Sequence, residues 1–291
     1  MSCDAGAEWI ETDGLGGFAA GTATMARTRR YHALLCCAKT PPTSRMVLVN
    51  GIEAWLEAGG QRYPLTTQVY EPGVVHPDGY SRLIDFQADL WPTWTWAVTT
   101  PTGELRLRLE LFVPRHRPMC ILRWSRLDET SSRASAFSGE AALCVRPLLS
   151  GRDYHSTHHE NDAIDMWGFV SGVPGGQRVI FRPYHGVPET HVVTDAEYQH
   201  APDWYRGFRY DVEAYRGLDC REDLASPGVF TRVLSAGDRA HFLLSATTPA
   251  GDDDLAPEGA PAEQVGEYDD RERSRRETVG TGHVRAANAN L

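Results

Sequence analysis

The sequence contains no apolar run long enough to cross a membrane and no recognisable secretory signal. A membrane-spanning helix requires roughly 18 to 20 consecutive apolar residues, and no stretch of the 291 residues approaches that length. The segment Met1–Asp4 lacks the basic and apolar regions with which a signal peptide begins. We therefore expect a cytoplasmic protein without a membrane partner.

Positive charge is also scarce. Lys and Arg number 29 against 39 Asp and Glu, which gives a formal net charge of −10 at pH 7. No basic run is long enough to follow a nucleic-acid backbone, so DNA and RNA are excluded as expected partners. The acidic balance is compatible with a neutral ligand.

A metal or redox motif is missing as well. The six cysteines form no C-x-x-C pair, and in a reducing compartment they are expected to act as small buried hydrophobes. His155, His158, His159 and Glu160 are potential zinc ligands, but their spacing matches no established zinc motif, and a polar loop explains the same composition. We predict no metal and no cofactor.

Short alternating segments dominate the chain up to residue 248, and long helical patterns are nearly absent. Leu105–Phe112 alternates strictly, with four leucines on one face. Gly59-Gly60 predicts a hairpin turn. Core packing is the favoured role of Trp94 and Trp96. Strands are expected at 33–35, 45–50, 52–56, 61–65, 80–86, 94–98, 105–112, 120–124, 141–145, 179–182, 191–193, 208–212, 230–234 and 240–246. The prediction is an all-β fold, a large two-sheet antiparallel sandwich over residues 1–248.

The character of the chain changes after Pro249. Residues 249–261 are rich in Asp, Glu, Pro and Gly and are typical of an acidic linker. Residues 262–277 are expected to form one solvated helix, and the last residues show no core-forming pattern. We predict that residues 249–291 form a short helical or disordered tail.

Residues 8–37 hold the densest group of unusual residues, with four glycines followed by Arg29, Arg30, Tyr31 and His32. Gly14–Ala19 fits a dinucleotide-binding pattern on paper, but that mechanism requires a buried strand before it and a helix after it. The residues before it are polar, and the threonines after it favour extended structure. Nucleotide binding is therefore disfavoured.

The same stretch resembles a known family. Trp9–Phe18 followed by Thr28–His32 is similar to the opening of the N-terminal domain of bacterial and archaeal glycogen debranching enzymes. Two further clusters agree in order: Arg146-Pro147-Leu148 before Arg152-Asp153-Tyr154-His155, and Trp204-Tyr205 before Tyr215–Asp219 and Glu222–Leu224. Asp13, Phe18 and Ala33 depart from the usual Asn, Tyr and Gly of that family.

The resemblance implies a supersandwich similar to galactose mutarotase. It also implies that the hydrolytic site lies in a following helical domain, similar to an (α/α)6 toroid, which this sequence lacks. We therefore expect a non-catalytic module in glycogen breakdown that binds α-glucan, docks on a helical amylo-α-1,6-glucosidase domain, or does both. The candidate contact residues are Arg29, Arg30, Tyr31, His32, Trp91, Arg152, His155, Trp204, Arg216 and Glu222.

Two alternatives remain open. The chain could be an enzyme, either part of a split α-1,6-glucosidase or a sugar epimerase, for which His155 and Glu222 are the one acid and base pair to nominate. Glycoside hydrolysis usually needs two carboxyl groups, one with a raised pKa, and Asp219, Glu222 and Asp223 are expected to be exposed acids with no source for such a shift. The other alternative is an inactive remnant of a truncated gene, which the unpatterned tail favours.

Overall fold

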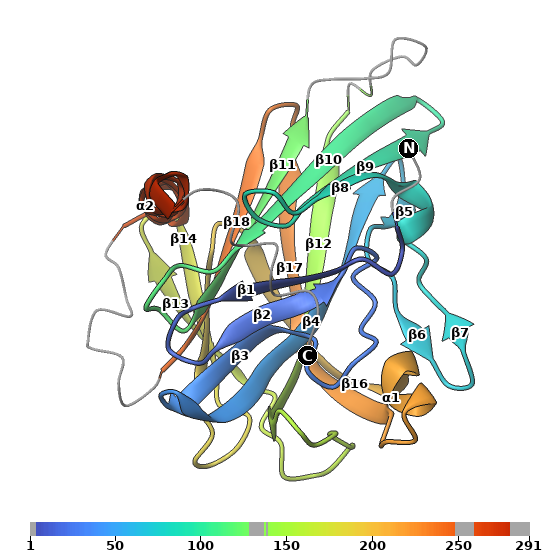
Figure 1. Cartoon of the computed structure of the whole chain (residues 1–291). Helices are drawn as coiled ribbons and strands as arrows, with labels where there is room; N and C mark the ends of the chain where they lie inside the picture. The colour runs from blue at the N-terminus through green and yellow to red at the C-terminus, as the bar shows by residue number, and fades with distance from the viewer. Residues whose placement is uncertain (1–3, 128–136, 138, 248–258, 280–291) are drawn as a thin grey trace.

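Two antiparallel β-sheets packed face to face make up most of the molecule (Figure 1). The computed structural model describes residues 4–127, 137, 139–247 and 259–279. Within these residues the larger sheet has ten strands in the order β1-β2-β3-β4-β12-β17-β16-β6-β7, with β5 paired to β4. Its strands are β1 (Glu8–Thr12), β2 (Phe18–Thr22), β3 (Ala33–Thr40), β4 (Thr43–Ala58), β5 (Gln61–Pro64), β6 (Val69–Tyr70), β7 (Val74–Val75), β12 (Ala141–Asp153), β16 (Glu197–Arg209) and β17 (Arg221–Leu234).

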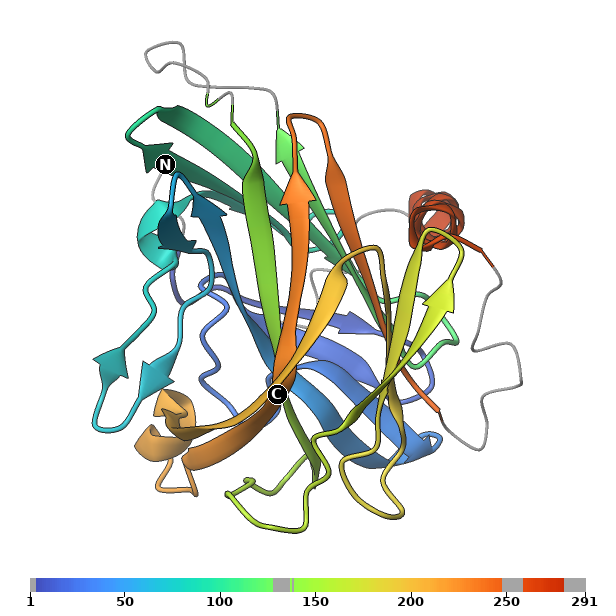
Figure 2. The same cartoon turned by 180° about the vertical axis from the view of Figure 1, so that it is seen from behind.

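The smaller sheet has eight strands in the order β13-β14-β15-β18-β11-β10-β9-β8. Figure 2 shows the sandwich from behind. Its strands are β8 (Leu83–Gln87), β9 (Thr93–Thr100), β10 (Gly103–Phe112), β11 (Met119–Leu127), β13 (Gly168–Val173), β14 (Gly176–Phe181), β15 (Thr190–Thr194) and β18 (Arg239–Ala246). Three helical elements complete the described chain: η1 (Tyr80–Arg82), α1 (Asp211–Tyr215) and α2 (Pro261–Val279). The prediction of an all-β, two-sheet antiparallel sandwich is confirmed.

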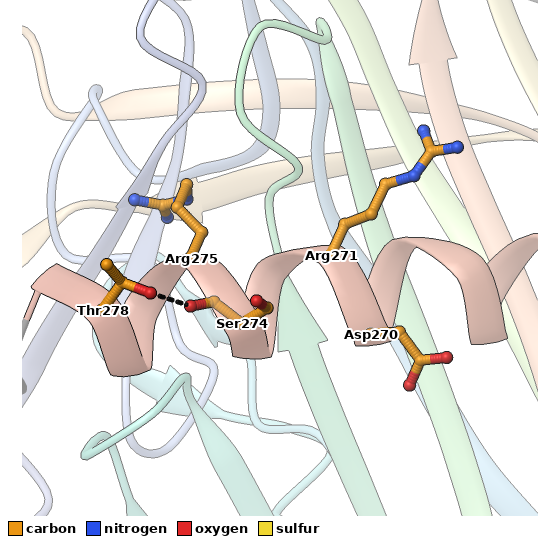
Figure 3. A pocket seen from close by; sticks show the side chains of 5 residues that line it. All are labelled: Asp270, Arg271, Ser274, Arg275 and Thr278. Carbon is orange, nitrogen blue, oxygen red and sulfur yellow. Dashed lines mark hydrogen bonds between the residues drawn. The ribbon is translucent and has the colours of Figure 1, made fainter.

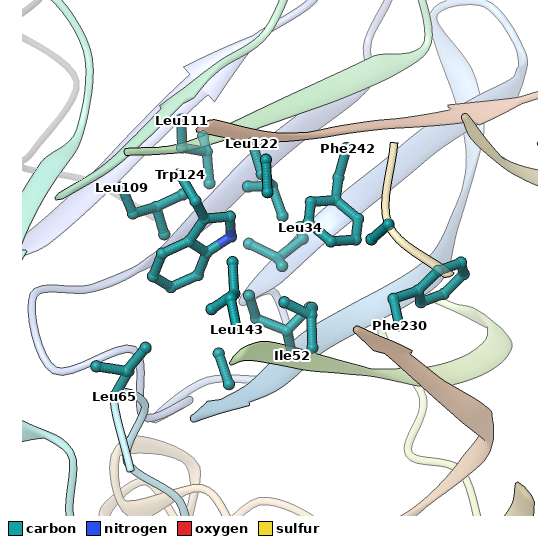
Figure 4. Close-up of a cluster of buried hydrophobic side chains, with 14 of the residues drawn as sticks. Leu34, Ile52, Leu65, Leu109, Leu111, Leu122, Trp124, Leu143, Phe230 and Phe242 are labelled. Carbon is teal, nitrogen blue, oxygen red and sulfur yellow. The ribbon is translucent and has the colours of Figure 1, made fainter. Parts of the chain in front are cut away.

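The hydrophobic core lies between the two sheets. Strand β10 shows how it forms, because every second side chain of this strand is apolar and points inward. Leu105, Leu107, Leu109 and Leu111 are all buried in the main cluster, as their alternation predicts. Phe112, the next residue, points to the other side of the sheet and belongs to a different cluster. Trp94, Trp96 and Trp124 also fill the main core, so the core prediction for the first two is confirmed. Figure 4 shows how side chains from both sheets, Trp124 and Phe230 among them, meet in this layer.

Helix α2 covers the outer face of the eight-stranded sheet. Val265 and Tyr268 of the helix pack in one cluster with Trp91 and Phe112. The last turn is tied to the other sheet, because Arg276 pairs through Nη1 with Glu11 of β1 at 3.1 Å. The prediction of a solvated helix is therefore wrong for this face, although it holds for the opposite face. Figure 3 shows that outward face, with the side chains of Asp270, Arg271, Ser274, Arg275 and Thr278.

Several strand boundaries also differ from the expectation. Residues 45–56 form one continuous strand within β4, and the expected strand at 208–212 ends at Arg209, where α1 follows after one residue. Glu8–Thr12, which is polar in sequence, forms strand β1. Every second side chain of this strand points inward, so that Trp9 and Glu11 are buried. The segment after the glycines is strand β2, so the helix that a dinucleotide site requires does not follow them.

The turn prediction is confirmed, and Cys36, Cys37, Cys120 and Cys144 are buried as expected, whereas Cys220 is half-buried. Gly59 and Gly60, both with positive φ, join β4 to β5 in a hairpin. Cys36 lies in a cluster on the outer face of the larger sheet, whereas Cys37 lies in the main core. No helix of the described residues combines the length and apolar composition of a membrane-spanning helix. Residues 249–258 and 280–291 of the predicted linker and tail lie outside the described residues.

Candidate functional site

A hollow of about 570 Å³ opens at the glycine-rich stretch, on the outer side of the ten-stranded sheet. It joins residues that lie far apart in sequence: Tyr31 comes from the segment before β3, and Tyr154 and His155 follow β12. The ring centroids of Tyr31 and Tyr154 are 5.5 Å apart, and those of Tyr31 and His155 are 5.9 Å apart. The full lining is Ile10, Thr12, Gly14, Gly16, Gly17, Phe18, Tyr31, Arg45, Tyr154 and His155. Two of the family-like clusters therefore meet in one place.

The glycines form one wall of the hollow because side chains would not fit there. Gly16 has a φ of 104°, and a Cβ atom on it would lie 2.5 Å from the carbonyl oxygen of Pro42. The Asp13 carboxylate closes the loop by accepting hydrogen bonds from the backbone N–H groups of Leu15, at 2.7 Å, and Gly17, at 2.9 Å. Burial raises the pKa of the Asp13 carboxyl. The glycines thus serve close packing and leave the wall of the hollow free of side chains.

Aromatic rings and one arginine form the rest of the wall. Arg45 donates through Nε to the carbonyl of Gly16 at 2.6 Å and through Nη1 to the hydroxyl of Tyr154 at 3.4 Å. The rings of Tyr154 and His155 are 3.8 Å apart between centroids. Because none of the lining side chains is a carboxylate, the hollow offers ring faces and hydrogen-bond donors but no pair of acids for glycoside hydrolysis.

Arg29 and His32 fasten the chain internally. Arg29 Nε lies 2.7 Å from a carboxylate oxygen of Glu8, and His32 Nε2 lies 3.5 Å from the same oxygen. His32 is buried and accepts a hydrogen bond from the backbone N–H of Thr28 at Nδ1. The hydrogen bond from His32 and the neighbouring Arg29 lower the pKa of Glu8 to about 2, while burial lowers the pKa of His32. Neither side chain lines the hollow.

Glu222 is the centre of a buried hydrogen-bond network. Its carboxylate accepts hydrogen bonds from Arg152 and from the hydroxyl of Tyr210. It also accepts from Asn50 Nδ2 at 3.1 Å and from the backbone N–H of His158 at 2.9 Å. Glu222 is fully buried, so the expectation of an exposed acid is wrong for this residue. The carboxylate neutralises Arg152 inside the protein and joins β4, β12 and β17.

This network also supports the hollow. Arg152 Nη2 donates to the carbonyl of Arg30 at 2.8 Å. The backbone N–H of Arg30 donates to the buried carboxylate of Glu213 at 3.2 Å, and its guanidinium donates to the carbonyl of His155. Arg30 thus joins the segment that carries Tyr31 to the segment that carries His155. Among the predicted contact residues, Arg30 and Arg152 therefore position the hollow, while Tyr31 and His155 line it.

The remaining predicted residues lie elsewhere. Trp91 is buried beneath α2, where the guanidinium carbon of Arg273 lies 4.3 Å from the ring centroid, so this tryptophan does not offer a free ring as expected. Trp204 stacks on His158, with ring centroids 5.4 Å apart. Arg216 caps α1, half exposed, with Nη1 3.7 Å from Glu213. The structure does not bring these three residues into the hollow.

The zinc and catalytic alternatives can be examined directly. Within the described residues, no three potential ligands lie close enough to hold a metal ion. His158 is already engaged, with Nδ1 2.9 Å from the carbonyl oxygen of Asp223 and Nε2 2.6 Å from the hydroxyl of Tyr184. The nominated pair of His155 and Glu222 does not form an acid and base site, because Glu222 is sealed inside the network described above.

Sequence reasoning missed Arg45 and Trp167. Arg45 lies at the hollow because β3 and β4 pair in an antiparallel register, and the local sequence does not predict that register. Trp167 is 64% exposed, whereas six of the eight tryptophans are buried. It sits just before β13, beside His200, and the local sequence does not predict its exposure, because Met166 and Phe169 lie close to it in the chain.

Comparison with known protein families agrees with the motifs. A family model described as the glycogen debranching enzyme N terminal matches residues 7–241, whereas the search of curated proteins found no match. Among solved structures, the chain is similar to a bacterial glucoamylase complexed with acarbose (12% identity, TM-score 0.39, 94% of this chain and 37% of that chain). It is also similar to a polysaccharide lyase (10% identity, TM-score 0.33, 87% of this chain and 34% of that chain).

The chain spans little more than a third of either of these proteins. The family match, in contrast, covers most of the chain, including β1, the segment that holds Arg30 and Tyr31, and the strands that surround Glu222. The chain therefore belongs to the family of glycogen debranching enzyme N-terminal domains.

Proposed function

We propose that this protein is the non-catalytic N-terminal module of a glycogen debranching enzyme and that the hollow binds α-glucan. The observation that carries the proposal is the meeting of Phe18, Tyr31, Tyr154 and His155 around one opening. These residues come from two motif clusters that are more than 120 positions apart. Packing of the core does not require that arrangement, because the hollow lies outside the sandwich core.

The chemistry of the hollow suits a neutral sugar chain. Flat aromatic faces stack on the apolar faces of sugar rings, and the hydroxyl, imidazole and guanidinium groups can bond sugar hydroxyls. A volume of about 570 Å³ lies within the range of small-molecule sites. The lack of a carboxylate in the lining and the burial of Glu222 both support binding without hydrolysis.

The test is binding of maltoheptaose by calorimetry, together with retardation in gels that contain glycogen. A ring contact is worth about 0.5–1.5 kcal/mol, so Tyr31→Ala or Tyr154→Ala should weaken binding about two- to tenfold. Tyr215→Ala is the matched control, since Tyr215 is 93% exposed and lies outside the hollow. Equal losses in all three variants, or no measurable binding by the unaltered protein, would contradict a glucan site in the hollow.

A second candidate function is docking on a helical glucosidase domain. The exposed end of α1 favours it, because Tyr215 and Leu218 present apolar surface there next to the half-exposed Arg216. A helical glucosidase domain supplied as a separate chain should co-elute with this protein, and Tyr215→Ala with Arg216→Ala should reduce that association. Tyr31→Ala should leave it unchanged. An association lost with Tyr31→Ala but kept without Tyr215 would assign docking to the hollow.

A further inference from the structure

Arg27 is a buried cation, and no carboxylate of the described residues forms an ion pair with it. Its side chain is 5% exposed, and its guanidinium carbon lies 4.6 Å from the centroid of the Phe208 ring. Within the described part of the chain, the Nε and Nη1 atoms have no hydrogen-bond acceptor. A buried donor without an acceptor costs about 1–3 kcal/mol, and more when it is charged. The Nε and Nη1 atoms therefore require an acceptor that the described residues do not supply.

A small cavity lies beside this guanidinium. It has a volume of about 20 Å³, and its lining combines the polar Arg27 and Asn50 with apolar side chains such as Trp9 and Leu34. Gly51 also lines it, and a Cβ atom there would lie 2.4 Å from Nη1 of Arg27. The arginine thus packs directly on the backbone of β4. A cavity of this size holds about one water molecule.

The hydrogen-bonding atoms of Asn50 determine which small molecule can occupy the cavity. Its Nδ2 atom donates to Glu222 at 3.1 Å, which fixes the orientation of the amide. Its Oδ1 atom is buried and has no donor within the described residues. The occupant must therefore accept from Arg27 and donate to Asn50. A halide can accept but cannot donate, so it would leave Oδ1 unpaired.

We propose that one buried water molecule bridges Arg27 and Asn50 and is a permanent part of the fold. Through Asn50 it connects Arg27 to the Glu222 network. The same network holds the carbonyl of Arg30 through Arg152, so the water fastens the first part of the 27–32 segment and Arg152 fastens the second. This inference does not depend on whether the hollow binds glucan.

The experiment is a crystal structure at about 1.5 Å, from crystals grown with sodium bromide and measured for anomalous scattering. We expect one density peak within hydrogen-bond distance of Arg27 and Asn50, without anomalous signal. An anomalous peak there would assign the site to an anion, and a cavity without density would refute the bridge. Either result overturns the proposal.

A solution measurement tests the role of the guanidinium. Deuterium and oxygen-17 relaxation dispersion counts water molecules that exchange slowly, and Arg27→Met should lower that count by one. Arg62→Met is the matched control, because Arg62 also lies over an aromatic ring, 4.2 Å from the centroid of Trp55, but is 55% exposed. An unchanged count in Arg27→Met would contradict the assignment. If that variant does not fold, the density in the unaltered protein decides.

Discussion

Replacing Arg152 with methionine should strongly lower the free energy of unfolding of the sandwich without removing a side chain that lines the hollow. The variant keeps a long apolar side chain but removes the donors to Glu222 and to the carbonyl of Arg30. Asn50, Tyr210 and the backbone of His158 still face the carboxylate, yet its charge loses the buried guanidinium with which it is paired. Breaking a buried ion pair from one side costs about 3–5 kcal/mol. For a domain of this size that corresponds to a fall of about 6–20 °C in Tm.

Urea unfolding followed by tryptophan fluorescence measures this loss, and a double-mutant cycle separates the pair from its surroundings. Glu222→Gln alone leaves Arg152 without a counter-ion, whereas the double variant removes both charges. We expect the double variant to be more stable than the sum of the single losses predicts, by about 1–3 kcal/mol. Losses below about 1 kcal/mol, or strictly additive ones, would refute the central role of this pair.

The remaining predictions concern pH, the glycine wall and the C-terminal helix. Because the pKa of Glu8 is lowered to about 2, its ionised form stabilises the fold above about pH 4.5, and this contribution is lost as the pH falls towards 2. A shift of that size corresponds to about 3 kcal/mol at most, and exposure of a third of the side chain reduces it to about 1–2 kcal/mol. In the Glu8→Gln variant, the fall in urea stability between pH 5 and pH 2 should therefore be smaller by that amount, and an unchanged fall would contradict the ion pair. Gly16→Ala should lower the free energy of unfolding by more than about 2 kcal/mol, because its positive φ is strained for alanine and Pro42 blocks the Cβ atom. Gly217→Ala, which also has a positive φ but open space around it, should cost about 1 kcal/mol. Equal costs would show that the close contact with Pro42 does not matter. Removal of residues 248–291 should uncover Trp91, which we expect to see as red-shifted fluorescence and increased dye binding, and identical spectra would mean that α2 does not cover it.

Strand faces could be predicted from the sequence because they depend on neighbouring residues. The alternation of apolar and polar residues over Leu105–Leu111 predicts which side chains point inward, and these side chains lie in the core of the structure. Element ends that depend on distant contacts could not be predicted. The expected strand at 208–212 gives way to α1, whose Glu213 is buried and bound to the backbone of Arg30. The sequence predicts a solvated α2 because the helix is rich in charged residues. Its buried charges pair with residues such as Glu11, 265 positions away, and the local sequence does not reveal these partners.

The motif residues could be found from the sequence, but their roles could not. Tyr31 and Arg152 both belong to family-like clusters, yet one lines the hollow and the other is sealed beneath it. The donors that bind a ligand are the same donors that fasten one segment of a protein to another. Only the burial of Glu222 and the path of the chain around it separate the two roles.

The hollow has a consequence for the order of events during synthesis. Its lining is complete only when Tyr154 and His155 have joined the residues between Ile10 and Arg45. Tyr154 and His155 follow directly after β12, which lies between β4 and β17, and β17 ends at Leu234. Contacts between such distant residues form slowly, because a long loop of chain must close first. A growing polypeptide on the ribosome therefore cannot form this opening until most of the sandwich has been made.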